Sequence, residues 1–311
     1  MLISCGLPVA GAWAGPDTLV RFATRAEELG YHGLWTFQRL LVAAGEDPGP
    51  MYRSVLDPLL ALTYAAARTR TIRLGVAVVN LPYLAPAYLA KQAATLDVLS
   101  AGRLDLGLGT GHSAAEFAAT GSAPDPRGRR TAEYLRVLRT LWTDEVSGYD
   151  GELYRLPRSS MLPKPVQPGG PPVLLGGSAD SALRRAGRIA DGWVSRSAAT
   201  VAEVARGAQL VRRAAADAGR DPAAVRIVVR GVVRFGDHAA DLPLSGDWAQ
   251  LRAGTRAYAE AGATELFYDL NWDPLIGSPD ADPQRAAQRA EEILTALAPG
   301  RRDAAESIGG N

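Results

Sequence analysis

The sequence predicts an α/β protein of the (β/α)8, or TIM, barrel class, and three observations lead to this fold. Short runs rich in β-forming residues alternate with stretches of helical periodicity along the 311 residues. Eight such runs occur, and each is followed by a helical stretch, as in a barrel of parallel strands. The length also suits a single α/β barrel. A doubly wound sheet is the alternative, but it usually needs fewer units and a reversal of strand order.

The expected strands are apolar runs bounded by turn-forming residues. In chain order they cover 2–7, 32–37, 72–79, 103–108, 172–176, 191–195, 225–235 and 264–270. The expected helices carry apolar residues three and four positions apart, as Leu19, Phe22, Ala23 and Ala26 illustrate. They cover 17–29, 56–68, 86–100, 128–142, 179–189, 199–217, 247–261 and 284–297.

One interval departs from this alternation. Residues 143–171 separate the fourth expected helix from the fifth expected strand, and their prolines and glycines predict a loop with at most a small hairpin. Long loops are usually functional, and at the top of a barrel this one would form a lid. We therefore expect one barrel domain over 1–298, with a lid-like insertion at 143–171, and a flexible polar tail over 299–311.

Composition argues against several classes of function. The net charge of +1 indicates neither a nucleic acid nor a membrane surface as partner. No apolar run approaches the roughly 18 residues of a membrane span, and residues 1–15 lack the basic start of a secretory signal. The single cysteine, Cys5, is interpreted as a core residue of a cytoplasmic protein. The three histidines are far apart, and no metal site is expected.

The ligand site is expected where the carboxyl ends of the strands meet, because barrel enzymes keep their active sites there. The segment "GRLDLGLGTGHS" (102–113) ends the fourth strand with alternating glycines, one residue short of the dinucleotide fingerprint. Bare backbone there lets a ligand approach closely, and Thr110 adds a hydroxyl. A tight turn without a ligand is the alternative.

A second glycine site ends the fifth strand. Gly176 and Gly177 precede Ser178, which we expect to be the N-cap of the next helix. Free N–H groups at that position would point at an anion, although plain N-capping after a tight turn explains the same pattern. Because the fourth and fifth strands are neighbours, the two glycine sites could hold one phosphate.

His112 is the candidate for proton transfer. It follows the first glycine site just before a helical turn, where a positive charge is disfavoured, so a neutral imidazole is expected. It could instead only shape the loop. Glu116, four residues later, could hold the imidazole or face solvent. The sequence has no G-x-S-x-G motif and no obvious strand-end lysine or carboxylate pair, which suggests that a cofactor supplies the difficult chemistry.

The chain resembles the bacterial luciferase-like oxidoreductases that depend on flavin or deazaflavin. The resemblance covers most of the first two-thirds of the chain and is loose in the last third. It is carried by "RAEELGYHGLWTFQRLL" (25–41), "RTIRLGVAVVNLPYLAPAYLAKQAATLDVLSAGRLDLGLGTGHSAAEF" (70–117) and "PPVLLGGSADSALRRAGRIADGWVSR" (171–196), with "YDGELYRL" (149–156) before the last. The family fold is the (β/α)8 barrel, and its members are often homodimers.

The resemblance also implies a cofactor site. Family members often carry a non-prolyl cis peptide at the end of the third strand, which the match places near Ala77–Val78. The cofactor-binding residues implied in this way are Gln38, Ala77, Val78, Gly109, Thr110, Gly111, Gly176, Gly177 and Ser178. The residues expected to wall a substrate pocket, with core packing as the alternative for the aromatic ones, are Trp13, Phe37, Arg39 and Tyr83.

Two departures from the family pattern bear on the chemistry. Many members have Asp-His at the end of the second strand, where this chain has Gln38 and Arg39. Members that use the deazaflavin coenzyme F420 often have Gly-Thr-Gly-Glu after the fourth strand, where this chain has Gly-Thr-Gly followed by His112. Since Gln38 and Arg39 do not titrate usefully near pH 7, His112 is the expected catalytic proton donor.

The resemblance thus implies hydride transfer between F420 and a small organic substrate. The alternatives are an FMN-dependent monooxygenase supplied by a separate reductase, a non-catalytic flavin-binding barrel and, more distantly, a phosphosugar enzyme. The Gly-Thr-Gly motif favours F420, whose anionic tail would need basic residues at the mouth of the pocket. The candidates for that contact, which could also form only a solvated face, are Arg39, Arg53, Arg127, Arg129 and Arg130.

Overall fold

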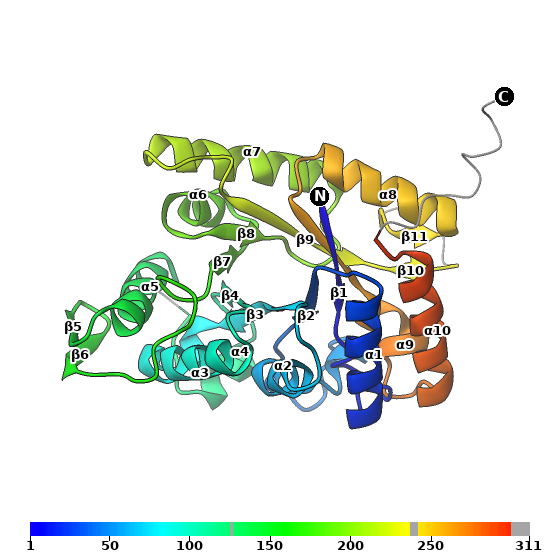
Figure 1. Ribbon diagram of the computed structural model, residues 1–311, viewed down its shortest axis with the longest axis horizontal. Helices are drawn as coiled ribbons and strands as arrows, with labels where there is room; N and C mark the ends of the chain where they lie inside the picture. The colour runs from blue at the N-terminus through cyan, green and yellow to red at the C-terminus, as the bar shows by residue number, and fades with distance from the viewer. Residues whose placement is uncertain (125–126, 237–241, 300–311) are drawn as a thin grey trace.

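The computed structural model describes residues 1–124, 127–236 and 242–299, and Figure 1 shows their arrangement. Eight parallel strands lie side by side in the order β1-β12-β9-β8-β7-β4-β3-β2, and β2 pairs with β1 to close a barrel. The helices surround the strands (Figure 1). The predicted (β/α)8 barrel is confirmed.

The barrel strands coincide with the eight expected runs. They are β1 Leu2–Gly6, β2 Gly33–Thr36, β3 Arg73–Asn80, β4 Leu104–Gly109, β7 Val173–Gly176, β8 Gly192–Val194, β9 Arg226–Val232 and β12 Glu265–Asp269. The run expected at 225–235 contains two strands, because pairing between β9 and β12 ends at Val232. After Val233, the residues Arg234–Phe235 (β10) pair with Ser245–Gly246 (β11) outside the barrel.

The helices begin at the signals that the sequence provides. They are α1 Pro16–Glu28, α2 Pro58–Ala66, α3 Pro86–Leu99, α4 Ala114–Ala119, α5 Arg127–Thr143, α6 Asp180–Ile189, α7 Val201–Asp217, α8 Trp248–Glu260, α9 Pro274–Gly277 and α10 Pro283–Ala296. Proline begins α1, α2, α3, α9 and α10, where its missing N–H would have had no helical partner. Capping boxes begin α7, with Thr200 and Glu203, and α8, with Asp247 and Gln250. The short helix α4 lies where a helical turn was expected after His112, whereas the short helix α9 was not expected.

The interval 143–171 contains the small hairpin that the sequence allowed, formed by Ser147–Asp150 (β5) and Arg155–Ser159 (β6). The hairpin lies outside α5, away from the barrel (Figure 1). Glu133 on α5 holds it there by accepting the N–H groups of Leu153 and Tyr154 at 2.9 and 3.2 Å. No residue of this interval lines the cavity described below, so the expected lid is not in place over it. Except for Pro299, the expected tail lies outside the described residues.

The barrel encloses an apolar cluster separate from the larger one between strands and helices. Its buried members come from six different barrel strands and are Trp35, Ala77, Leu174, Val194, Val228 and Phe267. The rings of Trp35 and Phe267 stack with their centroids 5.2 Å apart. Gly75 makes room for this stack, because a Cβ there would lie 2.4 Å from the indole of Trp35. Cys5 is fully buried as expected, and burial raises the pKa of its thiol.

A network of buried charges occupies the barrel interior near the amino ends of the strands. Asp105 lies 2.7 Å from guanidinium nitrogens of both Arg73 and Arg226, and Arg226 also lies 2.7 Å from Glu265. Glu265 further accepts hydrogen bonds from the Ser4 hydroxyl at 2.6 Å and the Trp35 indole at 2.8 Å. Both carboxylates are 1% exposed, and pairing offsets the free-energy cost of burying them.

Replacing Asp105 is therefore expected to destabilise the fold strongly. Asp105→Asn leaves two guanidinium groups facing one remaining carboxylate, at a cost of about 3–5 kcal/mol in the free energy of unfolding. Urea denaturation measures this cost. The matched control is Asp150→Asn, which breaks the exposed pair with Arg155 and should cost at most about 1 kcal/mol. Equal losses in the two variants would contradict a structural role for the buried network.

The same network predicts a dependence of stability on pH. Burial alone would raise the pKa of Asp105, but hydrogen bonds and charges from Arg73 and Arg226 more than offset this and hold it below its usual range. The stability that Asp105 contributes is then complete above the unfolded-state pKa of about 3.9 and is lost as the pH falls through the lower folded-state value. Unfolding free energies measured from about pH 6 downward should fall less steeply in Asp105→Asn than in the wild type.

Candidate functional site

A cavity of about 270 Å³ lies at the carboxyl ends of the barrel strands, near the lower limit of size for small-molecule pockets. It is lined by Phe37, Gln38, Arg39, Tyr52, Ala77, Val78, Asn80, Gly109, Thr110, Gly111, His112, Gly176, Gly177, Ser195, Arg196, Ser197 and Arg230. These residues come from the ends of β2, β3, β4, β7 and β8, from the interior of β9 and from the loops that follow the strands. Most of the residues that the sequence nominated are thus brought together.

The end of β3 carries the backbone feature that the resemblance placed there. The peptide bond between Ala77 and Val78 is cis, which confirms the expected position. The pairing of β3 with β4 shifts register between Val76 and Val79, around this bond. Val78 thereby lies in the cavity rather than wholly in the strand ladder.

At the end of β4, two glycines lie in close contact with neighbouring side chains. A Cβ on Gly109 would lie 2.4 Å from a methyl group of Val78, and one on Gly111 would lie 2.7 Å from the Tyr83 hydroxyl. Gly111 also has a φ of 70°, which favours glycine. A side chain at either position would collide with packed protein atoms, so glycine is required, and the backbone of both glycines lines the cavity.

Two amides tie the strand ends to one another. The side-chain oxygen of Gln38 accepts the N–H of Asn80 at 2.8 Å, and the side-chain oxygen of Asn80 accepts the N–H of Gly111 at 3.1 Å. This chain of hydrogen bonds crosses from the end of β2 through β3 to β4. Gln38 therefore fixes the wall of the cavity as well as lining it, a role that its residue type alone did not reveal.

The second glycine site differs in one respect from the expectation. Gly176 and Gly177 line the cavity, but the N-cap of α6 is Ala179, and Ser178 lies one residue before it. The predicted N-cap was wrong because the turn after β7 is one residue longer than assumed. Ser178 instead lines an adjoining cavity of about 60 Å³ with Trp193. No side chain caps the N-terminus of α6.

His112 lies at the rim of the cavity with an exposed side chain. Neither expectation for Glu116 was right, because its carboxylate is buried and does not contact the imidazole. It accepts the N–H of Leu40 at 2.7 Å and lies 3.6 Å from a guanidinium nitrogen of Arg39. The start of α4 folds this carboxylate inward, under the loop that follows β2. Burial and the charge of Glu116 raise the pKa of the neighbouring Tyr83 to about 12.

The four expected pocket residues divide into two groups. Phe37 and Arg39 line the cavity. Trp13 does not, because it is 1% exposed in the core and its ring packs edge-on against Phe22 at 5.6 Å. Tyr83 lies behind Gly111, edge-on to Phe117 at 5.4 Å, and is not part of the cavity lining. The prediction for Trp13 and Tyr83 was therefore wrong, since aromatic residues near strand ends also serve the core.

The arginines nominated for an anionic tail do not gather at the cavity. Arg39 lines it, with its guanidinium 4.4 Å from the ring centre of Tyr52. Arg53 pairs with Asp280 at 2.6 Å on the exposed surface. Arg129 pairs with Glu152 of the β5–β6 hairpin.

The sequence analysis missed Arg230, which lies in the middle of β9 and lines the cavity. Its guanidinium pairs with Asp269 at 2.7 Å, lies 4.4 Å from the ring centre of Phe37 and is 3.4 Å from the carbonyl oxygen of Ala77. Asn271 in turn donates to Asp269 at 2.9 Å. The available signal was weak, because the expected strand 225–235 contains three arginines among its apolar residues, Arg226, Arg230 and Arg234.

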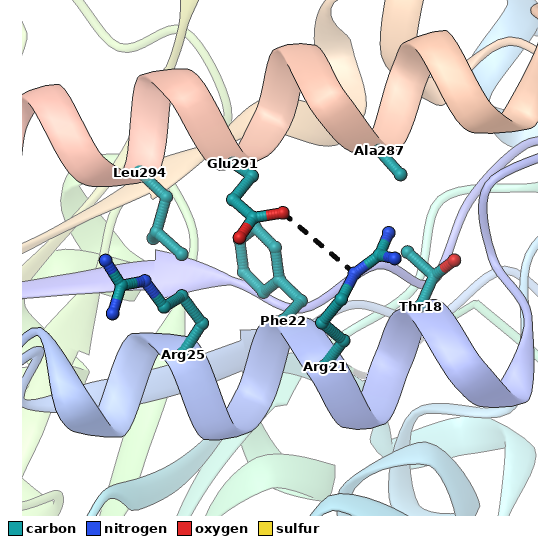
Figure 2. Close-up of a pocket in the computed structure, with 7 residues that line it drawn as sticks. All are labelled: Thr18, Arg21, Phe22, Arg25, Ala287, Glu291 and Leu294. Carbon is teal, nitrogen blue, oxygen red and sulfur yellow. Dashed lines mark ion pairs between the residues drawn. The ribbon is translucent and has the colours of Figure 1, made fainter.

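A second hollow lies on the outer surface between α1 and α10 (Figure 2). Phe22, Ala287 and Leu294 line it, and Arg21 faces Glu291 across it at 4.0 Å. Its volume of about 10 Å³ suffices for no more than a water molecule. The cavity at the strand ends is therefore the candidate functional site.

Comparison with known proteins identifies the family. The family model described as luciferase-like monooxygenase matches residues 4–298. The chain belongs to the luciferase-like family.

Among its luciferase-like relatives, an uncharacterized protein of Mycobacterium tuberculosis is 33% identical over 251 residues, which are 81% of this chain and 79% of that protein. An F420-dependent glucose-6-phosphate dehydrogenase of Kineococcus radiotolerans is 31% identical over 202 residues, 63% of this chain and 57% of that enzyme. The crystal structure of the monooxygenase RslO1 from Streptomyces bottropensis aligns with a TM-score of 0.79 and 21% identity, over 96% of this chain and 98% of that one. The last similarity shows the shared fold.

The cavity of this luciferase-like chain fits a flavin or deazaflavin cofactor. Gly109 and Gly111 line the cavity with backbone alone, so a phosphate-bearing arm can lie against the end of β4. The Thr110 hydroxyl offers a hydrogen-bond donor, and Gly176 and Gly177, just before the uncapped start of α6, line the same cavity. Val78 presents an apolar surface to a ring. In the described ranges, no three His, Cys, Asp or Glu side chains are grouped as metal ligands, and no helix is both long and apolar enough to cross a bilayer.

The position of Arg230 leads to a stability prediction. Arg230→Met leaves the Asp269 carboxylate buried without its cation, which should lower the free energy of unfolding by about 3–5 kcal/mol. The control is Arg196→Met, since Arg196 pairs with Glu203 at a half-exposed position, where such pairs contribute at most about 1 kcal/mol. Guanidinium chloride denaturation compares the two variants. A loss below about 1 kcal/mol in Arg230→Met would show that Asn271 alone satisfies Asp269.

Proposed function

We propose that this luciferase-like protein is an oxidoreductase that transfers a hydride between coenzyme F420 and a small organic substrate. The observation that carries the proposal is that the backbone of Gly109 and Gly111 on either side of Thr110, at the end of β4, lines one cavity together with the adjacent cis peptide Ala77–Val78. The match to an F420-dependent dehydrogenase at 31% identity supports this choice of cofactor.

Different residues of the cavity would bind the cofactor and orient the substrate. When bound, the cofactor supplies a ring carbon that accepts or donates hydride. Val78 supports the ring from one side, and Thr110 with Gly176 and Gly177 holds the phosphate-bearing arm. Phe37, Arg39 and Arg230 form the wall against which the substrate is oriented.

His112 moves the proton that accompanies the hydride. Its side chain reaches the rim of the cavity, and imidazole is the side chain whose ordinary pKa lies nearest to neutral pH. Arg39 and Glu116, which pair with one another at 3.6 Å, position the loop after β2 beside it.

The alternatives differ in cofactor and in activity. An FMN-dependent monooxygenase supplied by a separate reductase accords with the description of the family model. A non-catalytic flavin-binding barrel would retain the cavity, and the exposed position of His112 is the observation in its favour. We also propose that the protein forms a homodimer. The exposed side chains of Leu60 and Tyr64 on α2 and of Tyr88 on α3 are the apolar surface that a second copy would cover.

Titration with both cofactors tests the proposal. The purified chain should quench the fluorescence of F420 at micromolar concentrations and bind FMN at least about tenfold more weakly, a difference of about 1.4 kcal/mol. A panel of alcohols and carbonyl compounds, added with oxidised or reduced F420, should then change the absorption of the cofactor. Micromolar affinity for FMN without affinity for F420 would favour the monooxygenase. Binding of F420 without turnover would favour the non-catalytic barrel.

The role of His112 leads to a separate prediction. His112→Ala should lower the rate of hydride transfer about 10²–10⁴-fold, the usual contribution of a general acid or base, and leave the affinity for F420 nearly unchanged. Single-turnover absorbance changes measure the rate, and fluorescence titration measures the affinity. His32→Ala, at the opposite end of the barrel before β2, is the control. An unchanged rate in His112→Ala would remove His112 from the chemistry.

A further inference from the structure

A small cavity adjoins the main one behind the ends of β4 and β7. Thr110 and Gly176 line both cavities, so the two meet at these residues. The far side of the small cavity is formed by Thr131 in the first turns of α5 and by Arg185 in α6. Its volume of about 10 Å³ is too small for a ligand. It nevertheless places the Arg185 side chain behind Thr110 and Gly176, which also line the main cavity.

Arg185 stands in an electrostatically unfavourable place. Its side chain is half-buried, and burial lowers the pKa of its guanidinium. Among the residues that the structure describes, no carboxylate pairs with it. The guanidinium also lies against the first turn of α5, since a Cβ on Gly128 would lie 2.6 Å from one of its nitrogens. The start of a helix carries partial positive charge, so a cation there is repelled.

An anion bound at the junction of the two cavities would offset both the burial of the Arg185 charge and its repulsion by the start of α5. The Thr110 hydroxyl makes no hydrogen bond to any described residue, and no side chain caps the N-terminus of α6. The Thr110 hydroxyl and the backbone of Gly176 therefore border the junction that Arg185 lines from the other side. Arginine is suited to such a site, because its planar guanidinium donates two parallel hydrogen bonds to a phosphate.

We propose that Arg185 is the cationic anchor for the phosphate group of the cofactor. The inference rests on the proposed function, but it holds for either cofactor, because FMN carries a phosphate monoester and F420 a phosphate diester. The site combines one charged group from α6 with neutral donors from β4 and β7. It thereby distinguishes phosphorylated from unphosphorylated forms of the same ring system.

The other arginines of α6 provide matched controls. Arg184 is exposed and lies 3.7 Å from Asp180 on the same helix. Arg188 is exposed in the last turn of α6 and lines neither cavity. Arg188→Gln removes the same charge from the same helix as Arg185→Gln, at a position that does not face the phosphate.

The experiment compares the affinities of four compounds for wild type, Arg185→Gln, Arg185→Lys and Arg188→Gln by fluorescence titration. The compounds are F420, its phosphate-free deazaflavin alcohol, FMN and riboflavin. Arg185→Gln should weaken binding of the preferred phosphorylated cofactor about 10- to 100-fold and leave binding of its phosphate-free counterpart unchanged. Arg185→Lys should recover part of the loss, and Arg188→Gln should bind all four compounds like the wild type.

The other possible results of these titrations would overturn either the role of Arg185 or the proposed function. If both Arg185 variants bound the phosphorylated and the phosphate-free compounds more weakly by the same factor, Arg185 would have a purely structural role and the inference would be overturned. An unchanged preference for phosphate in Arg185→Gln would overturn it as well, while the proposed function stood. If the wild type bound none of the four compounds, the proposed function would fall, and the inference with it. Circular dichroism and thermal unfolding establish that each variant is folded, and Arg185→Lys retains the charge if Arg185→Gln unfolds.

Discussion

The pairing of two buried carboxylates with two arginines underlies the rest of this barrel. Asp105 and Glu265 share Arg226, and Asp105 also binds Arg73, so β3, β4, β9 and β12 are joined inside the barrel near their amino ends. Charged groups so deeply buried are tolerated only when they are paired and hydrogen-bonded. Above them the stacked rings of Trp35 and Phe267 fill the interior, which leaves space for a ligand only at the carboxyl ends of the strands.

A second buried pair determines the floor of that space. Arg230 projects from β9 against the Phe37 ring and toward the Ala77 carbonyl, and Asp269 from β12 holds it there. The ends of β2, β3, β9 and β12 are thereby fixed relative to one another. The amides of Gln38 and Asn80 continue the same framework to β4. A cofactor site built on connected strand ends is held rigidly, as positioning of a reacting ring requires.

The sequence predicted the parts of this site that depend on local backbone. Glycines at 109 and 111, and at 176 and 177, indicated the ends of β4 and β7, because bare backbone next to a strand marks close approach whatever surrounds it. Side chains that act across the barrel could not be found in this way. Glu116 turned inward to Arg39, and Trp13 joined the core, because the direction of each depends on neighbours distant in sequence.

By itself the sequence determined the fold class, the order of strands and helices, the family and the position of the cis peptide. The fold class and the order of elements follow from local periodicity and capping signals, whereas the family and the position of the cis peptide follow from the resemblance carried by short motifs. Only the tertiary structure decided that the hairpin of the interval 143–171 lies beside α5, that no residue of this interval lines the cavity, and that Arg230 lines it while Arg185 lines the small cavity next to it. The physical reason is that barrel closure brings together side chains from strands far apart in the chain, and burial and charge pairing then select their orientations.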